Sequence, residues 1–329
     1  MTAILQSRKV EISEIPVLDF AQLERGPAAR AKLHADMRQA CETIGFFYMQ
    51  NHGVSAAACD KILGEAHRLF ALSKAELQEM AMTKSPFYRG FLEIGQRGTN
   101  LERPPDILEA FNLGQDYGPD HPGVKSGKKL HGPNQWPKNL PGFKEAVIEW
   151  QGLMDGTMRK VLHALAGAID VPYEQFGPWF DKPLCQMRLL HYPPQPPQIG
   201  HMMGARPHQD TSFMTILLQD DRGGLEVEAR NGEWLQAPPR KDMFVVNVGE
   251  YLELYTSGVC YPAKHRVVNR SGKARYSVPF FFSPNFDTVV DPLPDFAAKP
   301  NARPFKPMHI GNDMARFFNS LWPTVGSGG

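Results

Sequence analysis

HRVVNRSGKARYSVPFFFSPN, residues 265–285, decides the fold of this chain. Two strand-like runs, 262–268 and 275–283, flank a short polar segment that contains Gly272. Successive side chains of a strand point to opposite faces, so Arg275 and Ser277 share one face. The stretch therefore predicts two neighbouring strands that carry polar side chains on one face.

Further strand-like runs precede this stretch, and Asn231-Gly232 between two of them is typical of a hairpin turn. They are 185–192, 213–219, 224–229, 233–237 and 243–248. Many short strands at regular spacing favour a sandwich or barrel. The first half has helical periodicity instead, over 28–44, 55–72 and 143–169, with a capping box at Ser73–Glu76 and an irregular segment over 83–142.

The expected architecture is one domain over residues 1–322, in which helices wrap a β core. Residues 1–175 form its largely helical N-terminal portion, 176–290 its core and 291–322 its C-terminal helical region, with a helix over 313–321. The Gly-rich residues 323–329 are expected to be a disordered tail.

Composition excludes several classes of protein. The 36 Lys and Arg residues nearly balance the 35 Asp and Glu residues, so we expect neither nucleic acid nor an anionic membrane surface as a partner. No stretch approaches the roughly 20 apolar residues of a membrane helix. The first 20 residues lack the pattern of a secretory signal, and none of the four cysteines forms a Cys-x-x-Cys pair. We therefore expect a cytoplasmic protein.

The tripeptide His-x-Asp occurs twice, and the predicted secondary structure separates the two copies. His34 and Asp36 lie in a helical pattern, where residues i and i+2 point about 200° apart and cannot share an ion. His208 and Asp210 enter a predicted strand, where residues i and i+2 face the same side. The second copy is therefore the candidate metal site.

His265, on the strand predicted over 262–268, is the candidate third ligand. Two histidines and one carboxylate on one face leave open positions on iron, as in the facial triad of non-haem Fe(II) oxygenases. Zinc favours four ligands and is the weaker interpretation. A guanidinium and a hydroxyl, at Arg275 and Ser277, suit the far carboxylate of a dicarboxylic acid.

In this order and at these gaps, the residues resemble the isopenicillin N synthase-like family of non-haem Fe(II)/2-oxoglutarate-dependent oxygenases. Other segments are similar to the family's motifs along nearly the whole chain: Ile15–Phe20, Gly45–Gly53, Arg89–Phe91, Gly223–Val227, Val248–Glu250 and Phe281–Asn285. Residues 188–194 resemble the microbial members, such as thymine hydroxylase. Residues 131–137, together with the segment around Arg188, are similar to the ethylene-forming enzyme.

The resemblance implies a double-stranded β-helix, or jelly-roll, that oxidises a small organic molecule, most often by hydroxylation. The reaction is coupled to decarboxylation of 2-oxoglutarate to succinate and CO2 and uses Fe(II) and O2. Carried over to this chain, the iron ligands are His208, Asp210 and His265. The residues expected to bind 2-oxoglutarate are Arg275, Ser277, Tyr192 and Arg188, and those expected at the substrate are Phe281, Arg89 and Glu109.

Several alternatives stay open at this stage. One is an iron oxidase of the same fold that does not use 2-oxoglutarate, and another is fragmentation of 2-oxoglutarate of the ethylene-forming type. A zinc hydrolase or isomerase on a jelly-roll, or a binding module without catalysis, is more remote. We expect a monomer or weak homo-oligomer, and the sequence does not identify the substrate.

Overall fold

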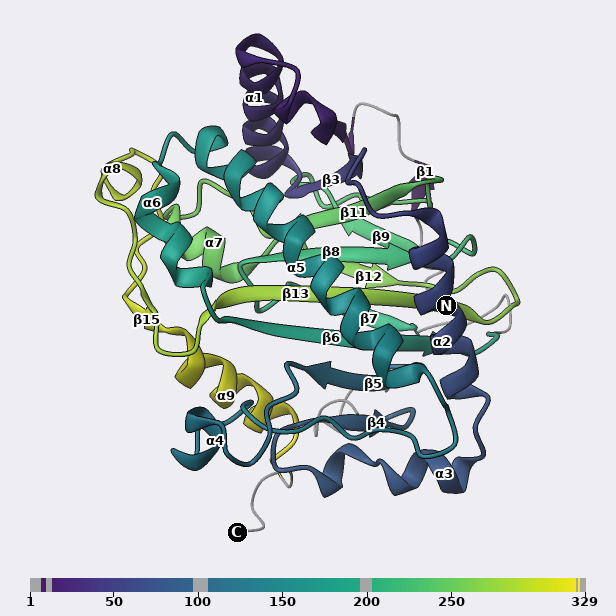
Figure 1. Cartoon of the computed structure of the whole chain (residues 1–329). Coiled ribbons are helices and arrows are strands. Elements are labelled where there is room, and N and C mark those ends of the chain that lie inside the picture. The colour runs from purple at the N-terminus through teal and green to yellow at the C-terminus, as the bar shows by residue number, and fades with distance from the viewer. Residues whose placement is uncertain (1–6, 10–13, 97–105, 196–202, 324, 326–329) are drawn as a thin grey trace, which may run out of the picture.

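The structure is a computed structural model that describes residues 7–9, 14–96, 106–195, 203–323 and 325. Its core is an eight-stranded sheet that faces a five-stranded sheet (Figure 1). The larger sheet has the order β2 (Val17–Asp19), β3 (Phe46–Gln50), β11 (Met243–Val248), β8 (Met214–Gln219), β13 (Arg275–Asn285), β6 (Pro183–Tyr192), β5 (Glu109–Gly114) and β4 (Gly90–Leu92). The smaller sheet has the order β1 (Arg8–Lys9), β10 (Trp234–Gln236), β9 (Leu225–Glu228), β12 (His265–Val267) and β7 (Ala205–His208).

Helices cover the outer face of the larger sheet, where α5 runs across the strands in Figure 1 and contacts β13, as does α2. The long helices are α1 (Pro27–Thr43), α2 (Ala56–Phe70), α5 (Phe143–Ala168) and α9 (Ile310–Leu321). The short ones are α3 (Lys74–Glu79), α4 (Pro122–Lys125), α6 (Tyr173–Phe176), α7 (Glu250–Tyr255) and α8 (Pro294–Ala297). A small ribbon of β14 (Val289–Val290) and β15 (Met308–His309) precedes α9, and three 3-10 helices span Phe20–Leu23, Met82–Lys84 and Gly177–Phe180.

The sequence predicted most of these elements, including the jelly-roll type of core, which is confirmed. The capping box at the start of α3 is present, with the Ser73 hydroxyl accepting from the Glu76 amide. The largely helical first 175 residues also contribute four strands, β2, β3, β4 and β5, to the larger sheet, and β4 and β5 lie in the segment predicted to be irregular. Of the expected disordered tail, residues 324 and 326–329 lie outside the described residues, whereas Val325 is buried.

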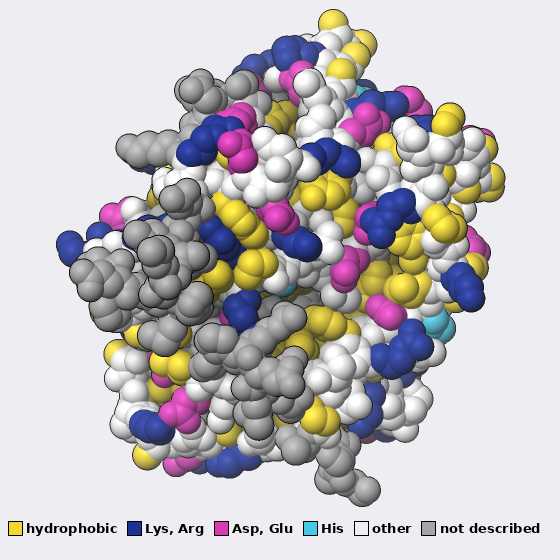
Figure 2. Space-filling view, turned by 180° about the vertical axis from the view of Figure 1, so that it is seen from behind, with side chains coloured by type: hydrophobic (Ala, Val, Ile, Leu, Met, Phe, Trp, Pro, Cys, Tyr) yellow, Lys and Arg dark blue, Asp and Glu magenta, His cyan; other side chains and the backbone are white. Residues whose placement is uncertain are grey.

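No helix among the described residues is long and apolar enough to cross a membrane. On the face drawn in Figure 2, the coloured Lys and Arg side chains are interspersed with Asp and Glu side chains rather than gathered in one broad patch. This mixed surface agrees with the balanced charge of the sequence.

Candidate metal and co-substrate site

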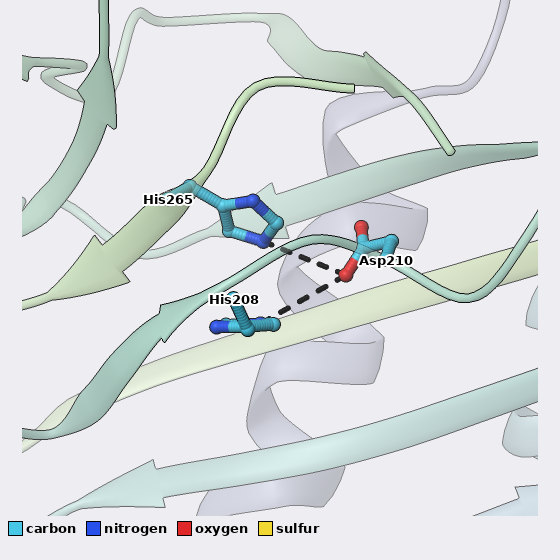
Figure 3. Close-up of side chains that lie close together, drawn as sticks. All are labelled: His208, Asp210 and His265. Atoms are coloured by element: carbon cyan, nitrogen blue, oxygen red, sulfur yellow. Dashed lines mark ion pairs between the residues drawn. The ribbon is translucent and has the colours of Figure 1, made fainter. Parts of the chain in front are cut away.

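Three potential metal ligands come together where strands β7 and β12 of the smaller sheet lie side by side. His208 is the last residue of β7, and it pairs in register with His265, the first residue of β12. Asp210 follows two residues after β7, and its Oδ1 lies 3.8 Å from His208 Nε2 and 3.5 Å from His265 Nε2 (Figure 3). The three ligand atoms lie within 4.8 Å of one another, as a single bound ion requires.

The carboxylate of Asp210 is held by two buried neighbours that sequence reasoning did not identify. Thr215 Oγ1 donates to Asp210 Oδ2 at 2.8 Å, and Asn247 Nδ2 donates to the same oxygen at 2.7 Å. Burial alone would favour the neutral acid, but the two imidazoles and Asn247 outweigh it and hold the pKa of Asp210 well below its usual range. The carboxylate is therefore charged, with Oδ1 turned toward the histidines.

Each histidine ring is oriented by its Nδ1 atom, whereas its Nε2 atom faces the metal site. His208 Nδ1 lies 2.7 Å from the Arg206 carbonyl oxygen, which only accepts, so this nitrogen carries the proton and Nε2 is left as a ligand. His265 Nδ1 faces the Ala263 carbonyl at 3.4 Å, and the ring packs edge-on against Phe46. Two imidazole nitrogens and one carboxylate oxygen are the donor set that suits non-haem Fe(II).

The other His-x-Asp copy does not build such a site. His34 and Asp36 lie in α1, and Asp36 instead forms an i, i+4 ion pair with Lys32 at 2.5 Å. Among the described residues, the group with metal-ligand geometry is His208, Asp210 and His265.

Arg275 lies deeper in the same cavity and is fully buried. Its guanidinium donates to three neutral oxygens, those of Gly223 O at 2.6 Å, Ser277 Oγ at 3.0 Å and Gln219 Oε1 at 3.2 Å. It also lies over the ring of Tyr192, with which Arg275 pairs in register. No ion pair of Arg275 is found within the described parts of the chain, so a carboxylate from a small molecule would supply the missing counter-charge.

The cavity extends from Arg275 past the metal ligands toward α9. Alternate residues of β6 line it, and Arg188 lies four residues from Tyr192, about 13 Å along the strand at ~3.3 Å per residue. The Arg188 guanidinium lies over the rings of Phe281 and Trp322. Arg188 therefore lies apart from Arg275 along the cavity, next to Phe281, and its binding of 2-oxoglutarate stays a prediction.

The two other residues expected at the substrate do not line this cavity. Glu109 pairs with His191 on the outer face of the sheet, at 2.7 Å and beneath Phe70 of α2, so its contact with substrate stays a prediction. Arg89 is only 1% exposed and donates a hydrogen bond to Gln186, which lies between it and the cavity, so its contact with substrate also stays a prediction.

Two family models match the chain. One describes the N-terminal region of the non-haem dioxygenase in morphine synthesis and matches residues 15–139, and the other describes the 2OG-Fe(II) oxygenase superfamily and matches residues 183–284. The second match contains all three candidate metal ligands together with Arg275 and Ser277.

Individual proteins are similar along most of their length. The 2-oxoglutarate-Fe(II) type oxidoreductase hxnY of Emericella nidulans is 34% identical over 92% of this chain and 88% of that protein. Homoarginine-6-hydroxylase 2-ODD-C23 of Glycine max is 33% identical over 88% of this chain and 92% of that protein. A full-length Neurospora crassa protein, crystallised in complex with alpha-KG, superposes with a TM-score of 0.83 and 25% identity, over 95% of this chain and 99% of that one.

Proposed function

The chain belongs to the 2OG-Fe(II) oxygenase superfamily, and from that premise we propose that it hydroxylates a small molecule in the cavity beside His208, Asp210 and His265. It is a 2-oxoglutarate-dependent dioxygenase, as its sequence resemblance predicted, and its cofactors are Fe(II) and the co-substrate 2-oxoglutarate. The observation that carries the proposal is the spacing of the three ligand atoms, within 4.8 Å, next to a buried guanidinium without an acidic partner among the described residues.

Each side chain then has a separate role. We assign iron to His208 Nε2, Asp210 Oδ1 and His265 Nε2, with Thr215 and Asn247 holding the Asp210 carboxylate in place. When bound, the iron supplies the O2 chemistry that the protein side chains lack.

The co-substrate site is assigned from charge and register. We assign the distal carboxylate of 2-oxoglutarate to Arg275 and Ser277, with Tyr192 against the guanidinium. The buried Arg275 favours 2-oxoglutarate chemistry over an oxidase that lacks this co-substrate, because an unpaired buried cation is costly. We assign Arg188 to the substrate end, beside Phe281, rather than to 2-oxoglutarate.

The substrate type, the cellular location and the oligomeric state are proposed on less direct evidence. Small molecules are named for related proteins: homoarginine in the soybean enzyme and thymine in one complex of the Neurospora crassa protein.

The four cysteines are unpaired, which supports a cytoplasmic location. We also propose that residues 1–322 work as one domain, supported by N-terminal β3 pairing with β11 of the core, and that the protein is a monomer or weak homo-oligomer.

The proposed function is tested by turnover. Anaerobically purified protein is supplied with Fe(II), 2-oxoglutarate, O2 and a fractionated small-molecule extract, and succinate and oxidised products are followed by mass spectrometry. We expect succinate formation that needs both Fe(II) and 2-oxoglutarate and rises with the fraction that contains the substrate. Product formation without 2-oxoglutarate, or restored by Zn(II) in place of Fe(II), would contradict the proposal.

Phe281→Ala is expected to uncouple the reaction rather than to unfold the protein. Phe281 is half-buried, lines the cavity and lies opposite Gln186 in the sheet. Its removal should therefore weaken the positioning of the substrate but leave the metal ligands intact. We expect the ratio of succinate to oxidised product to rise, with iron and 2-oxoglutarate binding retained.

The neighbouring Phe280→Ala is the matched control. Phe280 is fully buried on the other face of β13, where truncation of a core phenylalanine costs ~3–5 kcal/mol. It should lower the melting temperature strongly. A similarly large drop for Phe281→Ala with coupling intact would instead place Phe281 in the core.

A further inference from the structure

Gln186 carries a buried hydrogen-bond donor that the site described above does not use. Its side chain lines the cavity and is 5% exposed. Its Oε1 accepts from Arg89 Nη1 at 2.9 Å, whereas its Nε2 has no hydrogen-bond partner among the described residues. A buried amide N–H left unpaired costs free energy, so such a group is a strong candidate for contact with a ligand.

Arg89 fixes the orientation of the amide. A guanidinium only donates hydrogen bonds, so the amide atom that it contacts must be the oxygen, and the NH2 group is turned the other way. Arg89 is held in turn by the Leu130 carbonyl at 2.7 Å. Gly114, which lies opposite Gln186 on β5, makes room for the Arg89 guanidinium, because a Cβ at position 114 would lie 2.1 Å from Arg89 Nη2.

Arg89 also places a positive charge behind the amide. It forms no ion pair with any residue that the structure describes, and its hydrogen-bond partners are neutral oxygens. Burial lowers the pKa of Arg89 to about 10, which still leaves the guanidinium charged at neutral pH. The nearby charge of Asp116 acts on Arg89 without a direct ion pair. A buried cation that no carboxylate contacts, next to a free donor, favours a negatively charged group in front of it.

The sheet register sets the distance between this donor and the metal ligands. Asn247, Thr215, Phe281 and Gln186 form one row across four adjacent strands. Thr215 holds Asp210, and Gln186 lies two strands away, about 10 Å at ~4.8 Å between strands. That separation accommodates one ring with a short substituent. The Arg188 guanidinium, which lies over Phe281, adds a second positive charge to this part of the cavity. The other walls there are aromatic or apolar: Phe281, Phe317, Phe318, Met314 and Leu108.

We propose that the oxidised substrate is a small carboxylic acid with a single planar ring, whose carboxylate accepts a hydrogen bond from Gln186 Nε2. Arg89 is a positioning residue that orients this amide and supplies the positive potential behind it. The inference rests on the proposed function, because it assumes that the ring lies between Gln186 and the iron ligands. It deepens that function by naming the chemical class of the substrate.

The test compares three probes of equal size and different charge: benzoate, benzamide and benzylamine. Binding is measured anaerobically by calorimetry or ligand-observed NMR, with Fe(II) and saturating 2-oxoglutarate, so that the acid cannot occupy the co-substrate site. We expect benzoate to bind most tightly and benzylamine most weakly. A preference for benzylamine, or no binding of benzoate by protein that binds 2-oxoglutarate, would overturn the inference.

Gln186→Glu is the decisive variant, because it gives Arg89 the carboxylate that it lacks while removing the free donor. We expect an unchanged or higher melting temperature, unchanged 2-oxoglutarate affinity and about 10- to 100-fold weaker benzoate binding, as for the loss of a hydrogen bond to a charged group. The matched control is Gln151→Leu, another amide next to Gly114 that does not line the cavity. Unchanged benzoate binding in folded Gln186→Glu would contradict the inference.

The role of Arg89 is tested by the ratio of benzoate to benzamide affinity, which a merely structural role would not change. Arg89→Met should bring this ratio close to one, and Arg89→Lys should restore part of the preference. If neither variant folds, Gln186→Glu alone decides the outcome. If the wild-type protein does not bind 2-oxoglutarate, the proposed function is refuted. If it binds 2-oxoglutarate but does not prefer benzoate to the other probes, only the inference is refuted.

Discussion

Asp210→Ala is expected to reduce turnover to below about 1% of the wild-type rate and to prevent stoichiometric binding of iron. Changes to groups that merely orient a metal ligand already cost about 10- to 100-fold in metal affinity or activity, and this change removes a ligand. Iron content after anaerobic reconstitution and succinate production are the two measurements. His208→Ala and His265→Ala should behave in the same way.

The second His-x-Asp copy offers a matched control for this experiment. Asp36→Ala removes the same side chain from the same tripeptide, but on the surface of α1, and should leave iron content and turnover near the wild-type values. Because Asp210→Ala also leaves Thr215 and Asn247 without their acceptor, its melting temperature is measured alongside. If Asp210→Ala does not fold, His208→Ala tests the assignment instead, because the His208 side chain is less buried than that of Asp210. Full iron content together with full activity in a variant of the triad would refute the assignment.

Arg275→Ala is expected to weaken 2-oxoglutarate binding by about 10²- to 10³-fold or more. The substitution leaves a buried carboxylate without its counter-charge, which costs ~3–5 kcal/mol. Arg275→Lys should recover only part of the affinity, because an ammonium cannot reproduce the two parallel hydrogen bonds of a guanidinium. The dissociation constant is measured by anaerobic titration in the presence of Fe(II).

Arg240→Ala is the control for the arginine experiment. Arg240 also lies over a tyrosine ring, that of Tyr48, but it does not line the cavity, so 2-oxoglutarate affinity should not change. Ser277→Ala should weaken binding less than Arg275→Ala, by about 10- to 100-fold for one lost hydrogen bond to a charged group. An unchanged dissociation constant in folded Arg275→Ala would show that another group holds the carboxylate.

The sequence was most informative where strand periodicity applied. Arg275, Ser277 and Phe281 were predicted to share a face from their even spacing, and all three line the cavity. The same reasoning holds less well for Asp210, because β7 ends at His208. Hydrogen bonds from Thr215 and Asn247, rather than the strand, direct the Asp210 carboxylate toward the histidines.

The strand predicted to carry His208 and Asp210 had no predicted bounds, and β7 spans Ala205–His208, with a sequence that makes it hard to recognise. Pro207 lies within this four-residue strand, and a proline argues against a central strand. β7 is the edge of the smaller sheet, where one side of the strand needs no partner and a proline is tolerated. The strand order of a sheet, which makes this an edge, cannot be obtained from one strand's own sequence.

The residues around the substrate end were the least predictable. Gln186 interrupts an otherwise apolar run in β6, and a polar residue in such a buried strand is a signal that sequence reasoning could have used. Arg89 and Glu109 come from an irregular segment, 97 and 82 residues from the partners they find in β6. Which face of the sheet each one meets is decided by that long-range pairing and not by local sequence.

The most direct test of the account is a crystal structure of the anaerobic complex with Fe(II) and 2-oxoglutarate, with data collected at the iron absorption edge. The account predicts a single anomalous peak bonded to His208 Nε2, Asp210 Oδ1 and His265 Nε2. It also predicts the distal carboxylate of 2-oxoglutarate on Arg275 and Ser277. Iron bound by other residues, or a co-substrate carboxylate held by Arg188 instead of Arg275, would contradict it.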